Sequence, residues 1–459
     1  MADVPVAPAN ILSHLRLPIG VIPTWRLLRT QAMAHVDDGK QAGRMKIAIV
    51  GTGVSGLVCA HLLGRAHDVT LFEADDRPGG HAHTVRVALP DGSVDVDTGF
   101  LVNNERNYPG LIALFADLGV ATKASDMSFG VCDEVSGLEW KGTSFDTVFA
   151  QRRNLVRPAF LRMLGDIVRF NRRARALLEA PADPTVSLGD LLESGRWSSQ
   201  FLNWYLIPMG SSIWSADPST FLGMPAVTFA RFFANHGLLE YGNQPDWRTV
   251  DGGSKRYVDA VLARLGSRVR LDEPVTKITR TVDEVELHTA SGPERFDQVV
   301  VATHSDQALE LLSDPSPAER DVLGAIRYQD NRATLHTDVG LLPANRKAWA
   351  SWNYHRVADQ PGRATLTYRL RSLQGIDSAD ELLITLNRDD AIDPSRVLRS
   401  FDYAHPVYDV AAIAAQARHE ELNGRHRTWY AGAYWGYGFH EDGVQSARVV
   451  CRRLAGEDL

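Results

Sequence analysis

The chain has 459 residues, of which 44% are hydrophobic and 23% are charged, and these values predict a globular protein of two or three domains. The formal net charge of −7 argues against a protein whose main partner is nucleic acid. The three cysteines are far apart, which excludes a disulfide framework and leads us to expect no metal site. The same use of cysteine fits a reducing, cytoplasmic setting. Because no spanning apolar run or signal-peptide pattern occurs, we expect a soluble or membrane-peripheral protein.

Residues 1–44 differ in composition from the rest of the chain. They are rich in Pro and Ala, carry an apolar patch, and end in the polar run AHVDDGKQAGR. We interpret this segment as a flexible N-terminal extension and assign it no chemistry.

The first motif lies at residues 46–73. KIAIVG predicts a buried strand, GTGVSG (51–56) a glycine turn, and the following Ala- and Leu-rich run a helix. In this GxGxxG pattern Gly51 allows the tight turn, Gly53 lets a pyrophosphate approach the backbone, and Gly56 lets helix and strand pack closely. The next strand, DVTLFE, ends at Glu73, where a carboxylate can accept hydrogen bonds from a ribose. The segment therefore predicts dinucleotide binding.

A second glycine pair follows at once, in the run EADDRPGGH (73–81). An NAD site needs little beyond the phosphate turn and the acidic residue, whereas the extended FAD molecule needs a further stretch of backbone that it can approach. We therefore predict non-covalent FAD. The contacts predicted from the two glycine turns and the acidic residue are Gly51, Gly53, Val54, Ser55, Gly56, Glu73, Gly79 and Gly80.

This run resembles the flavoprotein superfamily of amine oxidases and phytoene-type desaturases, whose motif reads E-A-x-x-R-x-G-G-R. The resemblance adds Ala74, Arg77 and His81 to the predicted FAD contacts, and His81 stands where the family has its last arginine. By the same resemblance, residues 94–120 place Gly99, Phe100 and Leu101 near the isoalloxazine ring, and the Val275 backbone meets adenine. In the closing motif (429–447), a strand ends in Ala431-Gly432 and a later glycine begins a helix, whose N-terminus would place Val444 and Gln445 at the flavin. Tyr434 stands where the family usually has an acidic residue.

The resemblance implies an α/β fold with an FAD-binding Rossmann-type domain of the glutathione-reductase-like, amine oxidase type. Its discontinuous segments are expected at 45–105, 246–310 and 425–459. An α+β substrate domain is expected to be inserted, in two pieces, at 106–245 and 311–424.

Two stretches of the expected substrate domain stand out. Residues 151–175 hold eight arginines and one aspartate, with Leu155, Phe160, Leu164, Ile167 and Phe170 on one helical side. Such a helix suits peripheral contact with an anionic membrane, or it is an ordinary solvated arginine face. Residues 201–239 are rich in aromatic side chains and poor in charge, as either a core or an apolar tunnel would be.

Shorter runs such as SWNY (351–354) and GYGFHEDGV (436–444) resemble a bacterial subgroup, the predicted NAD/FAD-binding proteins, which includes methyl-branched fatty acyl desaturases. The resemblance implies an oxidoreductase that oxidises or desaturates an apolar, fatty-acyl substrate by hydride transfer to FAD. Alternatives are an amine oxidase, a flavin-dependent double-bond isomerase, and a flavin-free lipid-binding protein of the same fold. The electron acceptor stays open.

Catalytic residues have little support in the sequence. Amine oxidases of the superfamily carry a lysine after the second flavin segment, where IRYQDNRATLHTD (326–338) offers Arg332 but no lysine. His336 in the same stretch is as well explained by a structural role. Tyr437 and His440, in the closing motif, are the first candidates.

Overall fold

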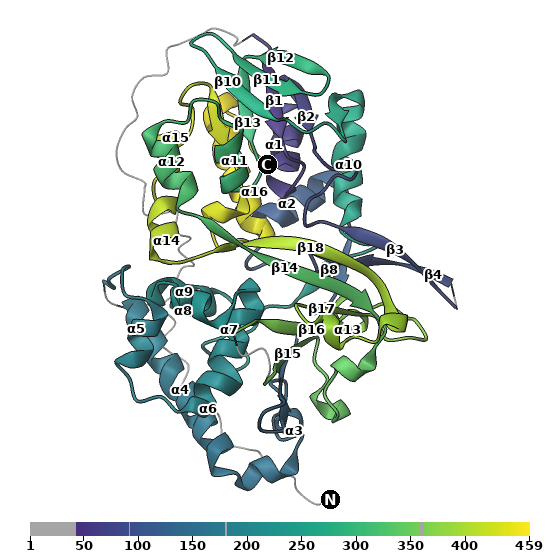
Figure 1. The fold of residues 1–459 in the computed structure, drawn as a ribbon, viewed down its shortest axis with the longest axis vertical. Helices are drawn as coiled ribbons and strands as arrows, with labels where there is room; N and C mark the ends of the chain where they lie inside the picture. Colours follow the sequence, from purple (N-terminus) through teal and green to yellow (C-terminus); the bar gives the residue numbers. More distant parts are fainter. Residues whose placement is uncertain (1–42, 91, 180, 359–361) are drawn as a thin grey trace, which may run out of the picture. The chain divides into compact units, whose positions relative to one another are not determined.

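Five parallel strands form the sheet that carries the first motif (Figure 1). The computed structural model describes residues 43–459 except 91, 180 and 359–361, so the expected N-terminal extension lies almost entirely outside the described residues. Across the sheet the strands are β19 (Thr428–Tyr430), β13 (Gln298–Val301), β1 (Lys46–Val50), β2 (Asp68–Phe72) and β9 (Val269–Arg270).

Both faces of this sheet are covered, which explains why β1 is apolar from Ile47 to Val50. Ile47 and Ile49 pack against a layer of helices, whereas Ala48 and Val50 pack toward a small antiparallel sheet. The helices are α1 (Val54–Leu63), α2 (Pro109–Leu118), α10 (Lys255–Leu265) and α16 (His440–Ala455). The small sheet is β10 (Lys277–Arg280), β11 (Val285–Thr289) and β12 (Gly292–Phe296), flanked by α11 (Ser305–Leu311) and α12 (Pro317–Gly324).

A second large sheet has seven strands, and all neighbours in it are antiparallel except β15 and β6. In order they are β18 (Val397–Val407), β14 (Arg327–His336), β17 (Leu383–Leu386), β16 (Thr365–Arg369), β15 (Trp352–Arg356), β6 (Phe129–Asp133) and β7 (Leu138–Lys141). The long strands β14 and β18 pair over nearly their full length at one edge (Figure 1).

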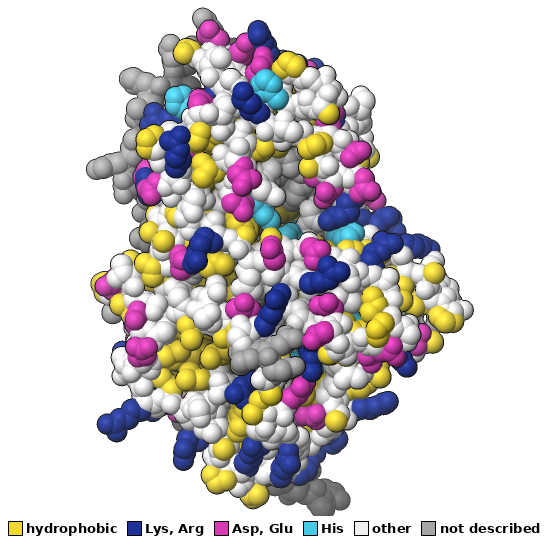
Figure 2. Space-filling model, in the orientation of Figure 1, with side chains coloured by type: hydrophobic (Ala, Val, Ile, Leu, Met, Phe, Trp, Pro, Cys, Tyr) yellow, Lys and Arg dark blue, Asp and Glu magenta, His cyan; other side chains and the backbone are white. Residues whose placement is uncertain are grey.

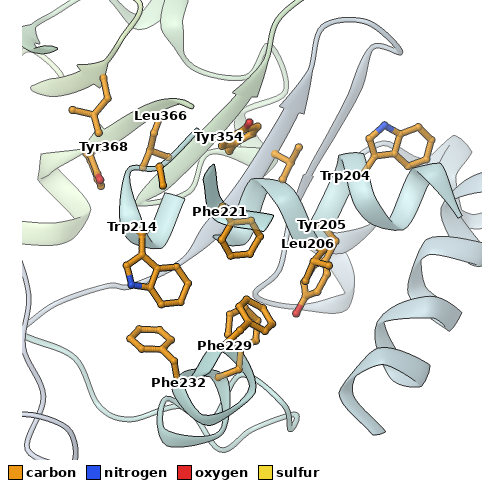
Figure 3. Packing of buried hydrophobic residues seen from close by; sticks show 14 of the residues in the cluster. Trp204, Tyr205, Leu206, Trp214, Phe221, Phe229, Phe232, Tyr354, Leu366 and Tyr368 are labelled. Atoms are coloured by element: carbon orange, nitrogen blue, oxygen red, sulfur yellow. The ribbon is translucent and has the colours of Figure 1, made fainter. Parts of the chain in front are cut away.

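A group of helices, several of them rich in aromatic residues, packs beside this sheet. The helices are α3 (Phe145–Val148), a 3-10 helix (Arg152–Val156), α4 (Pro158–Glu179), α5 (Leu188–Glu193), α6 (Ser199–Phe201), a π-helical turn (Leu202–Leu206), α7 (Ile207–Trp214), α8 (Pro218–Leu222) and α9 (Ala226–Asn235). Of these, α7 packs against β15 and the π-helical turn against β6. Figure 3 shows Trp214, Phe229 and Phe232 facing one another between helices and sheet, and the rings of Trp214 and Phe232 are 4.7 Å apart. The aromatic segment 201–239 is therefore largely core.

Short elements complete the described chain. They are the hairpin β3 (Thr84–Leu89) and β4 (Gly92–Asp97), the pair β5 (Thr122–Ala124) and β8 (Arg248–Val250), and the helices α13 (Leu370–Gln374), α14 (Val410–Gln416) and α15 (His419–Leu422). Short 3-10 helices lie at Gly266–Arg268, Val339–Leu341, Arg346–Ala348, Asp389–Ala391, Pro394–Arg396 and Ala433–Trp435. No helix in the described part of the chain combines the length and hydropathy needed to cross a bilayer.

The predicted α/β fold is confirmed. The strands of the parallel sheet all come from 45–105, 246–310 and 425–459, and those of the seven-stranded sheet from 106–245 and 311–424. The division into two domains stays a prediction, because residues 43–459 form a single compact unit.

The apolar face predicted for 151–175 is correct for the residues in α4, but Leu155, which the prediction also placed on it, does not belong to it. Phe160 and Phe170 are buried, and Leu164 and Ile167 are half-buried. Leu155 is 42% exposed, because it lies in the 3-10 helix before α4 and is out of phase with the helix face.

Candidate functional site

One continuous cavity of about 1370 Å³ runs from the first motif into the aromatic helices. At the motif end it is lined by Gly51, Thr52, Gly53, Val54, Ser55, Glu73, Gly80, His81, Gly99, Phe100 and Leu101. Farther along, α4, α7, α9 and residues 238–247 form its wall, with Leu164, Met209, Ile213, Phe232 and Leu238 among the lining residues. The cavity thus joins the predicted cofactor turn to an apolar compartment.

The glycine turn has the conformation that the first motif predicts. Gly51 has φ +101°, and a Cβ there would lie 2.8 Å from the Ala302 carbonyl oxygen. A Cβ on Gly56 would lie 1.9 Å from the Gly51 oxygen, so helix and strand can pack this closely only with glycine. A Cβ on Gly53 would meet no protein atom within 4 Å, because that position faces the cavity.

Glu73 organises the same turn. Its Oε2 accepts hydrogen bonds from the Thr52 amide at 3.0 Å and from the Thr52 hydroxyl, and its Oε1 accepts from the Asp75 amide at 3.1 Å. The carboxylate therefore lines the cavity directly beside the predicted phosphate turn.

The two glycines of the second pair differ in position. Gly80 lines the cavity, and a Cβ on it would lie 3.1 Å from the Gly53 Cα. Gly79 has φ +112° and does not line the cavity; a Cβ on it would lie 2.5 Å from the Ala82 carbonyl oxygen. Gly79 is thus required by the path of its own loop. Arg77 braces this loop by donating from Nη1 to the Gly80 carbonyl at 2.9 Å. Ala74 and Arg77 are also absent from the cavity lining.

Residues 99–101 reach the cavity because Asp97 anchors the strand before them. Asp97 accepts hydrogen bonds from the Ser254 amide at 2.8 Å, the Ser254 hydroxyl at 2.7 Å and the Thr84 hydroxyl at 2.5 Å. Burial raises the pKa of Asp97 to about 6, although these hydrogen bonds oppose the shift. The contact joins β4 to the loop before α10, so segments far apart in sequence hold Gly99–Leu101 in place.

The predicted placement of Val444 and Gln445 at the N-terminus of the closing helix is wrong. α16 begins earlier, at His440, because the Asp442 carboxylate accepts a hydrogen bond from the Phe439 amide at 2.9 Å and caps the first turn. Val444 is consequently buried within the helix layer, and Gln445 donates to Glu441 at 2.5 Å. Neither residue lines the cavity, and neither does Val275.

Other parts of the closing motif do reach the cavity. Gly432, Tyr434, Tyr437 and His440 line it. The His440 ring stacks on Phe100 with centroids 3.7 Å apart, and burial lowers the pKa of His440 to about 3. Burial raises the pKa of Tyr437 to about 12. Both candidate side chains are therefore uncharged at neutral pH.

Two residues from the stretch 326–338 lie away from the cavity. Arg332 is exposed and pairs with Asp402 at 3.1 Å. His336 is buried in the sheet, where its Nε2 lies 2.7 Å from the Thr385 hydroxyl and its Nδ1 accepts from the Asp338 amide at 3.0 Å. Neither lines the cavity.

A histidine cluster beside the first motif was not predicted from the sequence. The His81 ring lies 5.3 Å from His405 and 6.4 Å from His304, and all three line the cavity. Burial lowers the pKa of each, to about 4 for His405. The motif end of the cavity thus carries neutral imidazoles. Among the described residues, no Lys or Arg lines this end; Arg175 lines the cavity at α4.

These residues fit FAD. The first turn of α1 follows Gly53 without a capping side chain or an acidic residue, so its amides are available to a phosphate. Three buried polar atoms at the cavity, His81 Nε2, His440 Nε2 and Tyr408 Oη, have no hydrogen-bond partner among the described residues. A ligand with several hydrogen-bonding groups would satisfy them.

Comparisons with known proteins agree with this arrangement. Residues 54–336 match the family model described as flavin containing amine oxidoreductase. A Mycobacterium tuberculosis protein, AofH, assigned as a flavin-containing monoamine oxidase, is 29% identical over 284 residues, which are 59% of each chain. An L-amino acid dehydrogenase of Synechocystis is 26% identical over 60% of this chain and 59% of its own. The chain therefore spans about 59% of the length of these relatives.

Solved structures share the fold over nearly the whole chain. Cyclohexylamine oxidase from Brevibacterium oxydans superposes with a TM-score of 0.65 at 16% identity, covering 90% of this chain and 99% of its own. A conjugated-linoleic-acid-producing fatty acid isomerase from P. acnes gives a TM-score of 0.64 at 16% identity, covering 91% and 100%. At such identities the likeness concerns the fold.

Proposed function

Because the chain belongs to the flavin containing amine oxidoreductase family, we propose that it is an FAD-dependent oxidoreductase acting on an apolar, fatty-acyl substrate. The observation that carries this proposal is the continuity of the cavity, which reaches from the glycine turn to α4 and α9.

The chemistry of the cavity wall supports an apolar substrate. Apart from Glu73, the acidic and basic side chains that line it, Asp126, Arg175, Glu240 and Asp246, are all exposed to solvent. A charged group held in the inner part would lack a counter-ion, which makes its burial costly. Each methylene of an alkyl chain buried there would contribute about 0.8 kcal/mol.

FAD, when bound, supplies the flavin that accepts a hydride from the substrate. Gly53 and Gly80 would let it approach the backbone, and Phe100 and Leu101 form part of the adjoining wall. Tyr437 keeps its proton at neutral pH and can donate a hydrogen bond, whereas the unprotonated nitrogen of His440 can accept one. The aromatic wall excludes water from the same compartment.

The experiment is anaerobic mixing of the FAD-loaded protein with fatty acyl compounds of several chain lengths and with aliphatic amines. We expect the acyl compounds to bleach the flavin absorbance, more effectively as the chain lengthens. Analysis of the products detects an isomerase, which would convert an unsaturated acid without net bleaching. Bleaching by amines alone would reject an acyl substrate.

Amine oxidation is the second candidate, and a specific observation favours it. Three of the four exposed charged residues that line the cavity are acidic: Asp126, Glu240 and Asp246. They would attract a cationic amine, although solvent and salt screen exposed charges. The amine arm of the same experiment tests this candidate.

The proposal includes peripheral contact with a membrane through residues 151–175. Val156 is 80% exposed and Val168 is 60% exposed, and Val168 also lines the cavity. Figure 2 shows Lys and Arg side chains along the lower end of the molecule with hydrophobic side chains between them, where Figure 1 places α3 and the start of α4. A substrate taken from a lipid layer could therefore enter close to α4.

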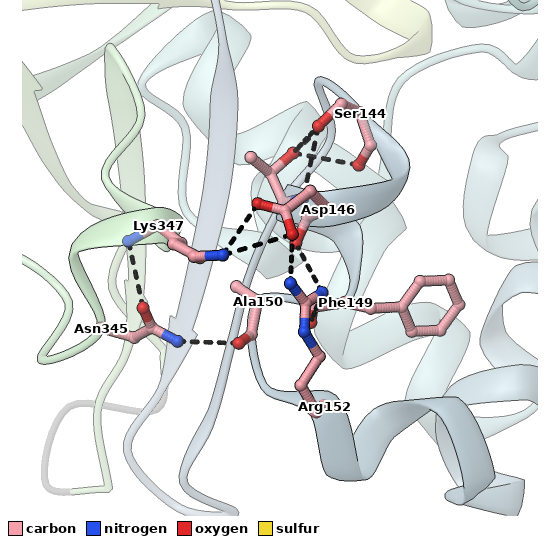
Figure 4. A network of polar contacts seen from close by, with 8 residues as sticks. Ser144, Asp146, Phe149, Ala150, Arg152, Asn345 and Lys347 are labelled. Carbon is pink, nitrogen blue, oxygen red and sulfur yellow. Dashed lines mark hydrogen bonds and ion pairs between the residues drawn. The ribbon is translucent and has the colours of Figure 1, made fainter.

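Ion pairs and a hydrogen bond fix the segment from α3 to the 3-10 helix before α4. Asp146 on α3 pairs with Arg152 and with Lys347, whose Nζ lies 3.1 Å from Oδ2 (Figure 4). Asn345 donates from Nδ2 to the Ala150 carbonyl at 2.9 Å. Since these contacts fix the backbone, the apolar side chains of Phe145 and Val156, 70% and 80% exposed, are presented without a large loss of backbone entropy.

A further inference from the structure

A chain of three side chains in the seven-stranded sheet ends at the cavity. Asn387 follows β17, Asn331 lies on β14 and His405 on β18, and each is hydrogen-bonded to the next. Asn331 and Asn387 are buried, whereas His405 lines the cavity. This chain determines which nitrogen of His405 carries the proton.

The direction of the first hydrogen bond is set by the backbone. The Arg332 amide, which can only donate, lies 3.0 Å from Asn387 Oδ1, and Arg363 Nη2 donates to the same oxygen at 3.1 Å. Asn387 Nδ2 must therefore be the donor to its other partners, the Asn331 Oδ1 at 2.7 Å and the Ala364 carbonyl at 3.0 Å.

The second hydrogen bond follows from the first. Because Asn331 Oδ1 is the acceptor from Asn387, Asn331 Nδ2 faces the other way, where it donates to the Gln329 carbonyl at 3.2 Å and meets His405 Nδ1 at 2.9 Å. His405 Nδ1 is thus an acceptor without a proton. A neutral imidazole carries its single proton on the other nitrogen, so Nε2–H is the donor.

The surroundings of His405 indicate what receives this hydrogen bond. Its ring lies 5.3 Å from His81, which follows Gly80, and His304 follows the segment whose Ala302 carbonyl closes over Gly51. His405 therefore faces the motif end of the cavity, away from the aromatic compartment.

We propose that His405 is an FAD-binding residue, contributed by β18 of the seven-stranded sheet, which donates its Nε2–H to an acceptor atom of FAD. Asn331 and Asn387 are positioning residues that keep His405 in this tautomer. The inference rests on the proposed FAD-dependent function, and it adds a cofactor contact from outside the three segments with flavin motifs. Burial and the neighbouring His304 lower the pKa of His405 to about 4, which agrees with a neutral ring.

The first test measures the affinity of the apoprotein for FAD by titration. His405→Leu removes the donor and should weaken binding about tenfold, as expected for one lost hydrogen bond. His405→Gln, whose amide can also donate, should retain affinity within about threefold of wild type. Asn345→Asp is the control and should bind as wild type does, because Asn345 precedes the 3-10 helix Arg346–Ala348, donates to the Ala150 carbonyl and does not line the cavity.

The second test reads the tautomer directly. In protein with ¹⁵N-labelled histidine, the His405 signal, identified by its loss in His405→Leu, should show the proton on Nε2. Asn331→Asp places a carboxylate against Nδ1, so that nitrogen should become protonated. A merely structural role for Asn331 would leave the signal unchanged.

The outcomes separate the two proposals. If wild type fails to bind FAD, the proposed function is wrong. If wild type binds FAD and His405→Leu binds it equally well, or if the proton lies on Nδ1 in wild type, the assignment of His405 is overturned.

Discussion

At Gly53 a substitution can remove FAD binding without preventing folding. The φ of Gly53 is −59°, which any residue can adopt, and a Cβ would meet no protein atom within 4 Å. We expect Gly53→Val to fold and to lose FAD, because the side chain occupies the cavity where the phosphates would approach. Flavin absorbance of the purified protein and its thermal midpoint measure the two effects.

Gly165→Val is the matched control, since Gly165 is also unobstructed and lies on α4. It should keep its flavin. Gly79→Val cannot serve as a second test of FAD binding, because it should misfold. Gly79 has a positive φ, and a Cβ on it would lie 2.5 Å from the Ala82 carbonyl oxygen. Normal flavin content in Gly53→Val would contradict the assignment of the turn.

Substitution of Glu73 should weaken FAD binding less than substitution of Gly53. Its carboxylate accepts hydrogen bonds from the Thr52 and Asp75 amides and lies beside the turn. We expect Glu73→Ala to weaken FAD binding by about 1–2 kcal/mol, through lost hydrogen bonds to the ribose and a looser turn. Titration of the apoprotein with FAD measures this loss, and unchanged affinity would remove Glu73 from the site.

At the scale of elements, the sequence predicted the strand, turn and helix of the first motif because all the signals are local. The start of α16 was missed, although Glu441 and Asp442 form an acidic first turn that is itself a helix-start signal. His405 could not be found in this way. Its role depends on pairing of β14 with β18, in which Asn331 and His405 are 74 residues apart.

α4 and the 3-10 helix before it carry the membrane prediction. We expect the protein to sediment with vesicles containing anionic lipid at low salt and to be released at high salt, since each arginine near such a surface contributes about 1 kcal/mol and salt screens it. Replacing Arg152, Arg153, Arg157 and Arg162 by Gln should abolish sedimentation and leave the flavin content unchanged.

The control variant removes four positive charges from arginines outside residues 151–175. Arg86, Arg295, Arg327 and Arg418 replaced by Gln should leave vesicle binding intact. A further variant, Phe145→Ser with Val156→Ser, tests insertion of the exposed apolar side chains and should weaken binding at intermediate salt. Equal sedimentation of wild type and the first variant would identify 151–175 as a solvated face.

At the scale of the whole molecule, the distribution of cysteines predicts how the cofactor is held. Cys59 and Cys451 are buried between α1 and α16, and no cysteine lines the cavity among the described residues. Acid precipitation should therefore release FAD into the supernatant. Flavin that stays with the precipitated chain would show a covalent bond and would require a different cofactor geometry.

The buried histidines make the folded molecule sensitive to acid. Burial lowers the pKa of His236, His336, His405 and His419 to about 4, and that of His440 to about 3, from an ordinary 6.5. Between these values the unfolded chain binds more protons than the folded one, so the free energy of unfolding falls as pH falls from about 6.5 to 4. Three buried carboxyl groups oppose this change, because burial raises the pKa of Asp97 to about 6, that of Asp442 to about 7, and that of Glu441 above its ordinary value. They are fewer than the buried histidines named above.

The thermal midpoint of the apoprotein should accordingly fall as pH is lowered from about 6.5 to 4. His336 lies in the sheet, away from the cavity, and His336→Gln removes one of these groups. The decline should then be shallower, because the slope of the free energy of unfolding against pH loses at most one proton, or about 1.4 kcal/mol per pH unit. His288→Gln, at a partly exposed histidine on β11, is the control and should parallel wild type. A midpoint that stays constant over this range would mean that the folded and unfolded chains bind equal numbers of protons, so that the pKa values of the buried imidazoles are not lowered.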